Sequence, residues 1–231
     1  MKKKLLLPDV TLLAATSIEI DQTQISLKIS SQKIQFGAIK LLSPSVPKIK
    51  YSDVEYVSIP PISLSDYNRM MIEDLHKHFE TSHCLIVQAD SFVVNPDLWT
   101  KEFMNFDYIG APWSNTIQVN PDVVLNLEQN PVGNGGFSLR SRKLVEKTAS
   151  INFKSLNFPI ENEDVIICHY LYKEMSDSGI RFAPPQLAAK FSLEDVNNQY
   201  GQKANNVFGF HGKHLRNYFL KKHTLRSSFE E

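Results

Sequence analysis

The sequence predicts an α/β fold in which a mostly parallel central sheet is flanked by helices. Short apolar runs alternate with segments of helical periodicity, which is the pattern of βαβ units. The run "HCLIVQADSFVV" (83–94) is continuously apolar before its polar break, as in strands buried on both faces. A chain of 231 residues with 42% hydrophobic residues suits one large domain, so we treat 1–231 as a single unit.

In the first half of the chain, 1–95, strands and helices follow one another in order. Residues 9–17 predict a buried strand with its C-terminal loop, and 20–32 have helical spacing. Two further strands are expected at 36–43 and 53–61, the second ended by Pro60 and Pro61. The segment 63–79 predicts a helix capped by Ser65 or Asp66.

The second half, 96–212, has a different pattern. We expect a helix over 95–106 with Asn95 as cap and Pro96 at its first position. The polar stretch 114–130 shows little periodicity and predicts a lid or a disordered loop. The remaining expectations are a strand at 135–141, helices at 142–150 and 162–179, extended chain at 180–192, and an end of the sheet region at 206–212. The helix at 162–179 is the strongest, because Asn162 can cap it, acids fill its first turn and Gly179 can end it.

The charge balance and the cysteines restrict the functional class. With 25 basic and 25 acidic residues the net charge is zero, which argues against nucleic acid as a main partner. Cys84 and Cys168 lie in apolar runs without CxxC spacing, so we expect reduced core residues in a cytosolic protein. The start "MKKKLLLPDV" has only three leucines before Pro8, too few for a signal peptide. The sequence thus predicts a soluble, cytoplasmic protein.

The C-terminal part, 213–231, is a basic tail. Residues 212–226 hold five Lys or Arg and no acid, with apolar Leu215, Phe219 and Leu220 between them. Two interpretations stay open: a solvated C-terminal helix, or a peripheral contact with the inner face of a membrane or with an anionic acceptor through 213–226.

Three short stretches have the residue types of a chemical site. "QAD" (88–90) ends the best strand, where ligands bind in parallel sheets, so its acid can hold a divalent cation or cap the next loop. The same rule points to the loops after Ser17, Ser43 and Pro60. "GNGG" (133–136) contains three of the nine glycines, which allow positive φ and a close approach of backbone to ligand, or simply a tight turn. "ENEDV" (161–165) opens a helix, so its acids can serve as helix-terminal charges or as a general base.

The order of these stretches resembles the GT-A glycosyltransferases. "GNGGFSLRSRKL … EDV" is closest to the β1,3-galactosyltransferase and Fringe-like group, with a similar order in the β1,4-galactosyltransferases. From about Leu85 to Gly212 the chain is also similar to a family of predicted glycosyltransferase-like domains of unassigned substrate, over "QAD … FDYIGAPW … VGNGGFSLRSRKL … ENEDVIICHYL … FGFHG".

The resemblance implies a GT-A-like fold and a hexosyltransferase activity, with a UDP-sugar bound by 1–95 and a glycan or lipid-linked acceptor, as in bacterial surface polysaccharide synthesis, bound by 96–212. Asp90 matches the last acid of the DxD motif that holds Mn²⁺ or Mg²⁺, while Gln88 replaces the first, which weakens that expectation. His211 stands where a late metal ligand is found.

Asp164 matches the base of the inverting families, and Glu163 would position the acceptor. The remaining expected contacts are Thr16 and Ser17 with the donor, Gly135 and Gly136 as the turn against which the sugars pack, and Trp113, Asn134 and Arg140 (or Arg142) with substrate.

Structural roles compete with several of these assignments. His211 suits a packed strand residue, Trp113 a core residue, and Arg140 or Arg142 a surface position. At the level of the whole chain, the alternatives are a catalytically degenerate module that binds nucleotide or glycan, a nucleotidyltransferase, and an interaction protein. The second lacks a glycine- and lysine-rich loop near the amino terminus, and the third does not explain the special residues at strand ends.

Overall fold

The computed structural model describes residues 4–121, 123–195 and 199–227. Its main sheet has six strands in the order β3-β2-β1-β4-β9-β6. The first four of these are parallel, and β9 runs antiparallel between β4 and β6. Their bounds are β1 Leu5–Ala15, β2 Ile34–Ser43, β3 Glu55–Ser58, β4 His83–Val87, β6 Tyr108–Ile109 and β9 Phe137–Ser141. The predicted α/β class with a mostly parallel sheet is therefore confirmed.

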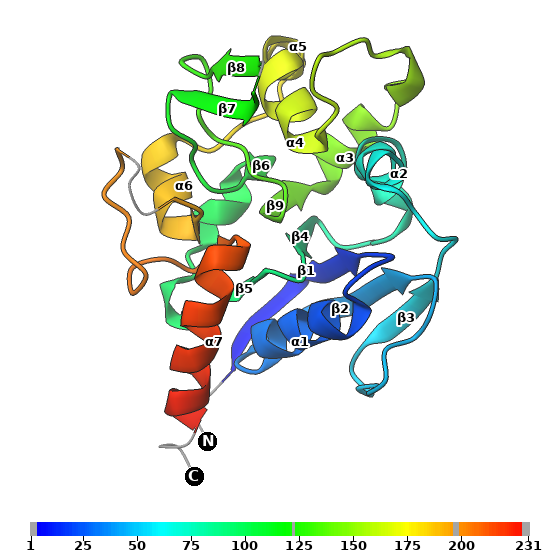
Figure 1. The fold of residues 1–231 in the computed structure, drawn as a ribbon, viewed down its shortest axis with the longest axis vertical. Helices are drawn as coiled ribbons and strands as arrows, with labels where there is room; N and C mark the ends of the chain where they lie inside the picture. The colour runs from blue at the N-terminus through cyan, green and yellow to red at the C-terminus, as the bar shows by residue number, and fades with distance from the viewer. Residues whose placement is uncertain (1–3, 122, 196–198, 228–231) are drawn as a thin grey trace.

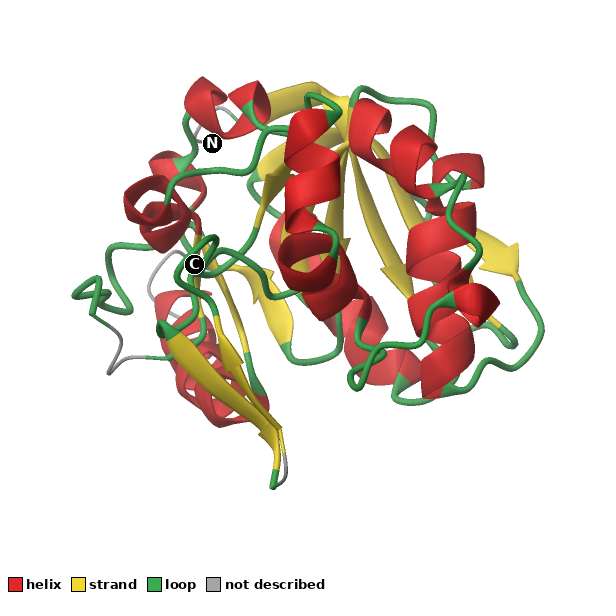
Figure 2. Cartoon of the chain, turned by 90° about the horizontal axis from the view of Figure 1, so that it is seen from above, coloured by secondary structure: helices red, strands yellow, loops and turns green. Residues whose placement is uncertain are grey.

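Helices cover both faces of this sheet (Figure 2). Successive residues of a strand point to opposite faces. Leu12 of β1 packs in a cluster with Leu27 of α1 (Ile20–Ser31) and Phe191 of α6 (Pro185–Phe191). Leu13 packs instead with residues of 67–79 and with Val145 of α3 (Arg142–Thr148). The near-continuous apolar sequence of the central strands follows from this two-sided burial.

Two smaller sheets lie beside the main one. Strands β10 (Ser192–Leu193), β11 (Gly209–His211) and β5 (Ser91–Val93) form a three-stranded sheet in that order. A separate hairpin consists of β7 (Thr116–Asn120) and β8 (Val123–Asn126). The C-terminal helix α7 (Lys213–Ser227) follows β11 directly and stands beside α1 and β5 (Figure 1).

Two predictions of irregular or extended chain were wrong. The predicted loop 114–130 contains the β7–β8 hairpin, whose strands of four and five residues are too short for a clear alternation. The predicted extended segment 180–192 contains α6, which begins directly after Pro184 with Pro185 at its first position. Proline is well tolerated there because the first N–H of a helix has no intrahelical partner.

The predicted helices are present but less regular than expected. The helix at 63–79 consists of α2 (Leu64–Arg69), a π-helical turn (Met70–Asp74) and a 3₁₀ turn (Leu75–Lys77). Its cap is Ser63, which forms a capping box with Asp66, and not Ser65 or Asp66. The helix at 162–179 is likewise divided into α4 (Glu163–Val165), a π-helical turn (Ile166–Tyr170) and α5 (Tyr172–Asp177).

Residues 95–106 form two short 3₁₀ helices, Pro96–Leu98 and Lys101–Asn105, where one α-helix was expected. The Asn95 side chain donates to the Val207 carbonyl at 2.8 Å and does not cap the first of them. Cys84 and Cys168 are free, buried cysteines, as predicted.

Candidate functional site

A pocket of about 420 Å³ opens at the carboxyl ends of β1 and β4. Thr16 and Ser17 of the loop after β1, and Gln88 and Asp90 of the loop after β4, line it as the sequence led us to expect. The loops after β1 and β4 thus border a cavity at the edge where ligands bind in parallel sheets. We call this cavity the donor-side pocket, after the expectation that 1–95 binds the donor; its other lining residues are Ala15, Ile18, Glu19, Thr23, Ile62, Ser63, Leu64, Tyr67, Ala89 and Lys213.

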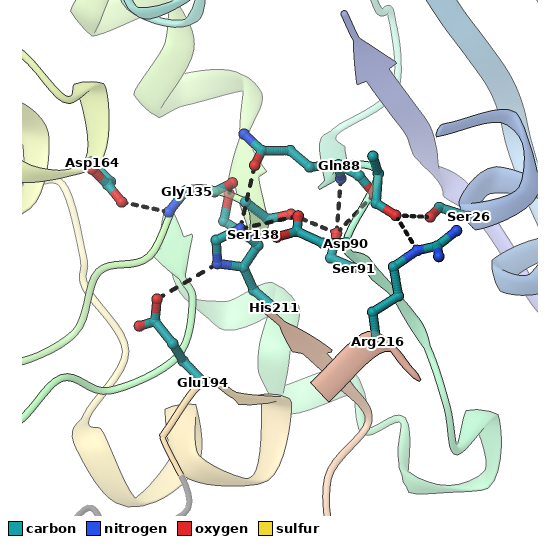
Figure 3. Close-up of polar contacts among 12 residues, drawn as sticks. Ser26, Gln88, Asp90, Ser91, Gly135, Ser138, Asp164, Glu194, His211 and Arg216 are labelled. Atoms are coloured by element: carbon teal, nitrogen blue, oxygen red, sulfur yellow. Dashed lines mark hydrogen bonds and ion pairs between the residues drawn. The ribbon is translucent and has the colours of Figure 1, made fainter. Parts of the chain in front are cut away.

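Hydrogen bonds from distant segments fix the 88–90 loop. The Ala89 carbonyl accepts from Ser26 Oγ of α1 at 3.1 Å and from Arg216 Nε of α7 at 2.8 Å (Figure 3). The Gln88 side chain donates through Nε2 to the hydroxyl of Tyr67 at 3.0 Å, so its Oε1 is left to face His211. The loop is thus held from both sides before any ligand binds.

His211 lies at the centre of the polar side chains around this loop (Figure 3). Its Nε2 is 3.5 Å from Asp90 Oδ1 and 3.3 Å from Gln88 Oε1, and its Nδ1 is 3.5 Å from Glu194 Oε1. Burial on its own would lower the pKa of His211, but the carboxylates of Asp90 and Glu194 outweigh it and raise the pKa to about 10. Without a bound cation, His211 is therefore a charged group held between two acids.

The ionisation of Asp90 is favoured by this positive charge. Burial favours its neutral form, but the His211 ring and, more weakly, Lys213 lower the pKa of Asp90 below its usual value. The sequence analysis expected Asp90 and His211 to be ligands of one cation, and here the two side chains are in contact.

Gly135 and Gly136 lie in close contact with side chains of the protein itself. None of the three glycines of "GNGG" has a positive φ; the left-handed residue is Asn134, at φ 59°. A Cβ on Gly136 would lie 2.2 Å from His211 Nε2, and one on Gly135 would lie 2.0 Å from Glu163 Oε1. The glycines therefore let the protein's own side chains approach the turn closely.

Two serines hold this glycine turn in place. The Gly136 carbonyl accepts from Ser91 Oγ at 2.7 Å, and the Gly135 carbonyl accepts from Ser138 Oγ at 3.0 Å. Ser91 also accepts from the Gln88 backbone N–H at 2.8 Å, which ties the turn to the 88–90 loop. The two stretches that the sequence marked separately thus form one structural unit.

Asp164 lies on the other side of the same turn. Its Oδ2 accepts from the Gly135 N–H at 2.8 Å and its Oδ1 from the Val165 N–H at 2.8 Å. Burial, with the nearby charges of Glu163 and Glu194, outweighs these hydrogen bonds and raises the pKa of Asp164 to about 7. A carboxylate with such a pKa can accept a proton near neutral pH.

Asp164 lines a second pocket, of about 410 Å³, which we call the acceptor-side pocket after the expectation that 96–212 binds the acceptor. It lies between the β7 strand, the start of α4 and the segment after β10. The lining residues are Pro112, Trp113, Ser114, Thr116, Ile117, Gln118, Asn162, Asp164, Val165, Glu194 and Asp195. Two consecutive residues of the glycine turn contact the two sites: Gly135 donates to Asp164, and Gly136 packs against His211, the neighbour of Asp90.

Arg140 and Glu163, which the sequence analysis expected at the substrate, are buried and paired with each other. Arg140 has no exposed surface and binds Glu163 through Nη2 and Oε1 at 2.6 Å. Its Nε donates to Ser138 Oγ at 3.0 Å. Arg142 also serves the structure, since its guanidinium donates to the carbonyls of His76 and Phe79. The buried pair lies behind the glycine turn, in close contact with Gly135. Its position therefore bears on the position of the turn and of Asp164.

Trp113 and Asn134 are both buried. The Trp113 ring packs directly on Gly133, where a Cβ would lie 2.0 Å from the ring, and its remaining surface lines the acceptor-side pocket. The core role and the ligand role of Trp113 are therefore compatible. Among the described residues, neither polar atom of the Asn134 amide has a hydrogen-bond partner. Burial of such an amide costs free energy unless water or a ligand supplies the missing hydrogen bonds.

The sequence reasoning did not assign Tyr67, Lys213 and Glu194 to the site, although each of them lines one of the two pockets. Tyr67 occupied an apolar position of a predicted helix, and burial raises the pKa of its hydroxyl above the usual value. Lys213 was treated as part of the basic tail although it lines the donor-side pocket. Glu194 carries no local motif; its position opposite His211 depends on strand pairing.

Helix α7 uses its apolar residues within the fold. Leu215 and Phe219 are buried, and Phe219 stacks on Phe210 of β11 with ring centroids 4.5 Å apart. Leu215 and Phe219 thus belong to the core of the fold, and a solvated helix and a peripheral contact through 213–226 both stay predictions. Residues 228–231 of the predicted tail lie outside the described chain. In the part that is described, no helix is both long enough and apolar enough to span a bilayer.

A family model described as "Protein of unknown function (DUF5672)" matches residues 53–211, more than half of the chain. The comparison with curated proteins gave no match. Among solved structures, the glycosyltransferase GlyE of Streptococcus pneumoniae TIGR4 is similar with a TM-score of 0.52 at 12% identity, over 95% of this chain and 60% of that one. This likeness shows a glycosyltransferase-like fold.

Two more solved structures have lower scores. The mannosyltransferase PcManGT from Pyrobaculum calidifontis, in complex with GDP-Man and Mn²⁺, has a TM-score of 0.47 at 12% identity, over 78% of this chain and 56% of that one. A glycosyltransferase involved in glycosylation of the major capsid of PBCV-1 has a TM-score of 0.44 at 13% identity, over 91% and 97%. The chain thus spans less than two thirds of GlyE and of PcManGT.

Proposed function

The chain belongs to the DUF5672 family, and from its site we propose that it transfers a sugar from a nucleotide-sugar donor to a hydroxyl group of a glycan or lipid-linked saccharide. The observation that supports this most directly is that one glycine turn contacts residues beside both pockets. Gly136 packs against His211, which contacts Asp90 of the donor-side pocket, and Gly135 donates to Asp164 of the acceptor-side pocket. Both have a volume in the usual range for small-molecule sites.

In this proposal the donor is a UDP-sugar that lies in the donor-side pocket. Thr16 and Ser17 border the nucleoside end of that pocket, and Ser17 is held by the Ile62 N–H at 2.7 Å. Lys213 supplies a positive charge beside Asp90, where a diphosphate needs one.

The polar atoms around His211 fit a divalent cation such as Mn²⁺ or Mg²⁺. In octahedral coordination at about 2.1 Å, adjacent ligand atoms are about 3 Å apart. The distances of 3.3–3.5 Å from His211 Nε2 to Gln88 Oε1 and Asp90 Oδ1 need only a small adjustment. The described residues contain no group of three His, Cys, Asp or Glu side chains for a metal, so Gln88 and the donor diphosphate have to complete the set. A cation there would neutralise charge on the departing diphosphate.

Asp164 is the proposed base. The acceptor hydroxyl oxygen attacks the anomeric carbon, the bond from that carbon to the diphosphate breaks, and the hydroxyl proton passes to Asp164. The nucleoside diphosphate leaves with the electron pair, and the configuration at the anomeric carbon is inverted. A pKa of about 7 suits this role, because the group is largely ionised just above neutral pH and still basic enough to take the proton.

One observation favours a second candidate, a module that binds nucleotide or glycan without turnover. Gln88 gives one neutral oxygen where the glycosyltransferases that the sequence resembles have a carboxylate, and its amide is already bonded to Tyr67. A site of this kind would bind UDP but release none from UDP-sugars.

Calorimetric titration with UDP, in Mn²⁺ and then in EDTA, followed by assays of UDP release from a set of UDP-sugars, tests the proposal. We expect metal-dependent binding that Asp90→Ala abolishes and that Asp97→Ala, an exposed acid of the following segment, leaves intact. Asp164→Asn should keep UDP binding and lower UDP release by about 10²-fold or more. Binding without any release would favour the non-catalytic module, and no nucleotide binding would contradict both the transferase and a nucleotide-binding module.

A further inference from the structure

The three-stranded sheet places His211 between two acids, one on each side. Strand β11 pairs in parallel with β10, and His211, the last residue of β11, faces the position just after Leu193. On its other side β11 pairs antiparallel with β5, with His211 opposite Ser91. As a result Glu194, His211 and Asp90 lie abreast although they are far apart in sequence (Figure 3).

The contacts of the His211 ring divide between its two nitrogens. Nε2 faces the donor side, toward Asp90 and Gln88, while Nδ1 faces Glu194, which lines the acceptor-side pocket. Gly136 covers the ring so closely that there is no space for a Cβ beside Nε2. The ring is thus limited on one side by Gly136, and Glu194 is the side chain that Nδ1 faces.

We propose that Glu194 is a positioning residue, which holds the Nδ1 side of His211 so that Nε2 is presented to a cation at Asp90 and Gln88. This inference rests on the proposed function, since it concerns the cation of that reaction. Metal-binding histidines in proteins generally donate their other ring N–H to a carboxylate, carbonyl or water, which fixes the tautomer and ring orientation. The Glu194 Oε1 atom is 3.5 Å from Nδ1, an ion-pair distance, and among the described residues Nδ1 has no hydrogen bond.

A competing role for Glu194 follows from its place in the acceptor-side pocket, because a carboxylate there can bind an acceptor hydroxyl. The two roles differ in what they affect. Loss of a positioning residue weakens cation binding even when no acceptor is present, whereas loss of an acceptor contact leaves cation binding unchanged. Asp195 lines the same pocket and is therefore the matched control.

The test is titration of Mn²⁺ into the full-length protein saturated with UDP, for wild type, Glu194→Ala, Glu194→Gln and Asp195→Asn. We expect Glu194→Ala to weaken Mn²⁺ binding by about 10–100-fold, the usual effect of losing such a partner. Glu194→Gln should lose less, because its amide oxygen still accepts the Nδ1–H, and Asp195→Asn should match the wild type. Unchanged UDP affinity in EDTA and unchanged melting temperatures would show that the variants fold and keep the donor-side pocket.

Two outcomes would overturn the inference, and they are separable from each other. If wild type binds Mn²⁺ and Glu194→Ala binds it equally well, Glu194 does not position His211, and the proposed function stands. If wild type with UDP shows no Mn²⁺ binding, the metal part of the proposed function fails, and this inference fails with it.

Discussion

Asp164, the base that we propose, is a residue whose ionisation lowers the stability of the folded chain. Its carboxylate accepts two backbone N–H groups, yet burial and the charges of Glu163 and Glu194 disfavour its ionised form. Arg140 is the nearby positive charge, but it is bound to Glu163. Natural sites often retain such unfavourable groups because the reaction needs them.

Replacing Asp164 by Asn should reveal this cost as a pH-dependent difference in stability. The folded protein keeps the Asp164 proton up to about pH 7, whereas an unfolded chain releases it near pH 4. Wild type therefore loses stability through this group as the pH rises from about 4 to about 7. We expect the melting temperature of Asp164→Asn, relative to wild type, to be more favourable at pH 8 than at pH 5 in scanning calorimetry. The exposed Asp97→Asn variant is the control, and an equal or reversed difference for Asp164→Asn would contradict the raised pKa.

At the scale of elements, a buried ion pair joins strand β9 to the start of α4. Arg140 of β9 and Glu163 of α4 are both buried, so neither charge is solvated if the other is removed. This pair sets where α4 begins relative to the glycine turn, because Gly135 contacts Glu163 and binds Asp164, the next residue. Its contribution is therefore to position more than to net stability.

Single and double replacements of this pair should be strongly non-additive. We expect Arg140→Met to lower the free energy of unfolding by about 3–5 kcal/mol, because Glu163 is left as an unpaired buried charge. Arg140→Met with Glu163→Gln should recover part of that loss, as measured by urea denaturation. The exposed pair of Lys173 and Asp177, at 2.6 Å, is the control, and Lys173→Met should cost less than about 1 kcal/mol. Additive losses at Arg140 and Glu163 would mean that the pair is not coupled.

At the scale of the whole molecule, the two halves of the chain share one sheet and one core. Strand β9 from the second half pairs with β4 from the first, and the largest apolar cluster includes Leu12 of β1 together with Phe191 and Phe208. A core that spans both halves cannot be divided without exposing it. This arrangement supports the description of 1–231 as a single domain.

We therefore expect one cooperative unfolding transition. Trp99 and Trp113 both lie in the second half, so their fluorescence reports on that half, whereas far-UV circular dichroism reports on all helices and strands. The urea midpoints from the two probes should coincide. Separate midpoints, or two calorimetric peaks, would show that the halves unfold independently.

Local features of the sequence were sufficient for the fold class and for part of the candidate site. The apolar runs of β1, β2 and β4 identified the central strands, since burial on both faces requires apolar residues at successive positions. Because ligands bind at the carboxyl ends of such strands, Thr16, Ser17, Gln88 and Asp90 could be assigned to one pocket. Asp164 was marked by its place at a helix start and by its resemblance to a known base.

Only the tertiary structure decided how these residues meet. Strand pairing brings Glu194 beside His211, close packing places Gly135 and Gly136 against protein side chains, and Arg140 is fully buried and paired with Glu163. The short β7 and β8 strands and the helix α6 after Pro184 were also beyond local patterns. The physical reason is the same in each case: contact, burial and pKa depend on residues distant in sequence, whereas periodicity and capping depend on near neighbours.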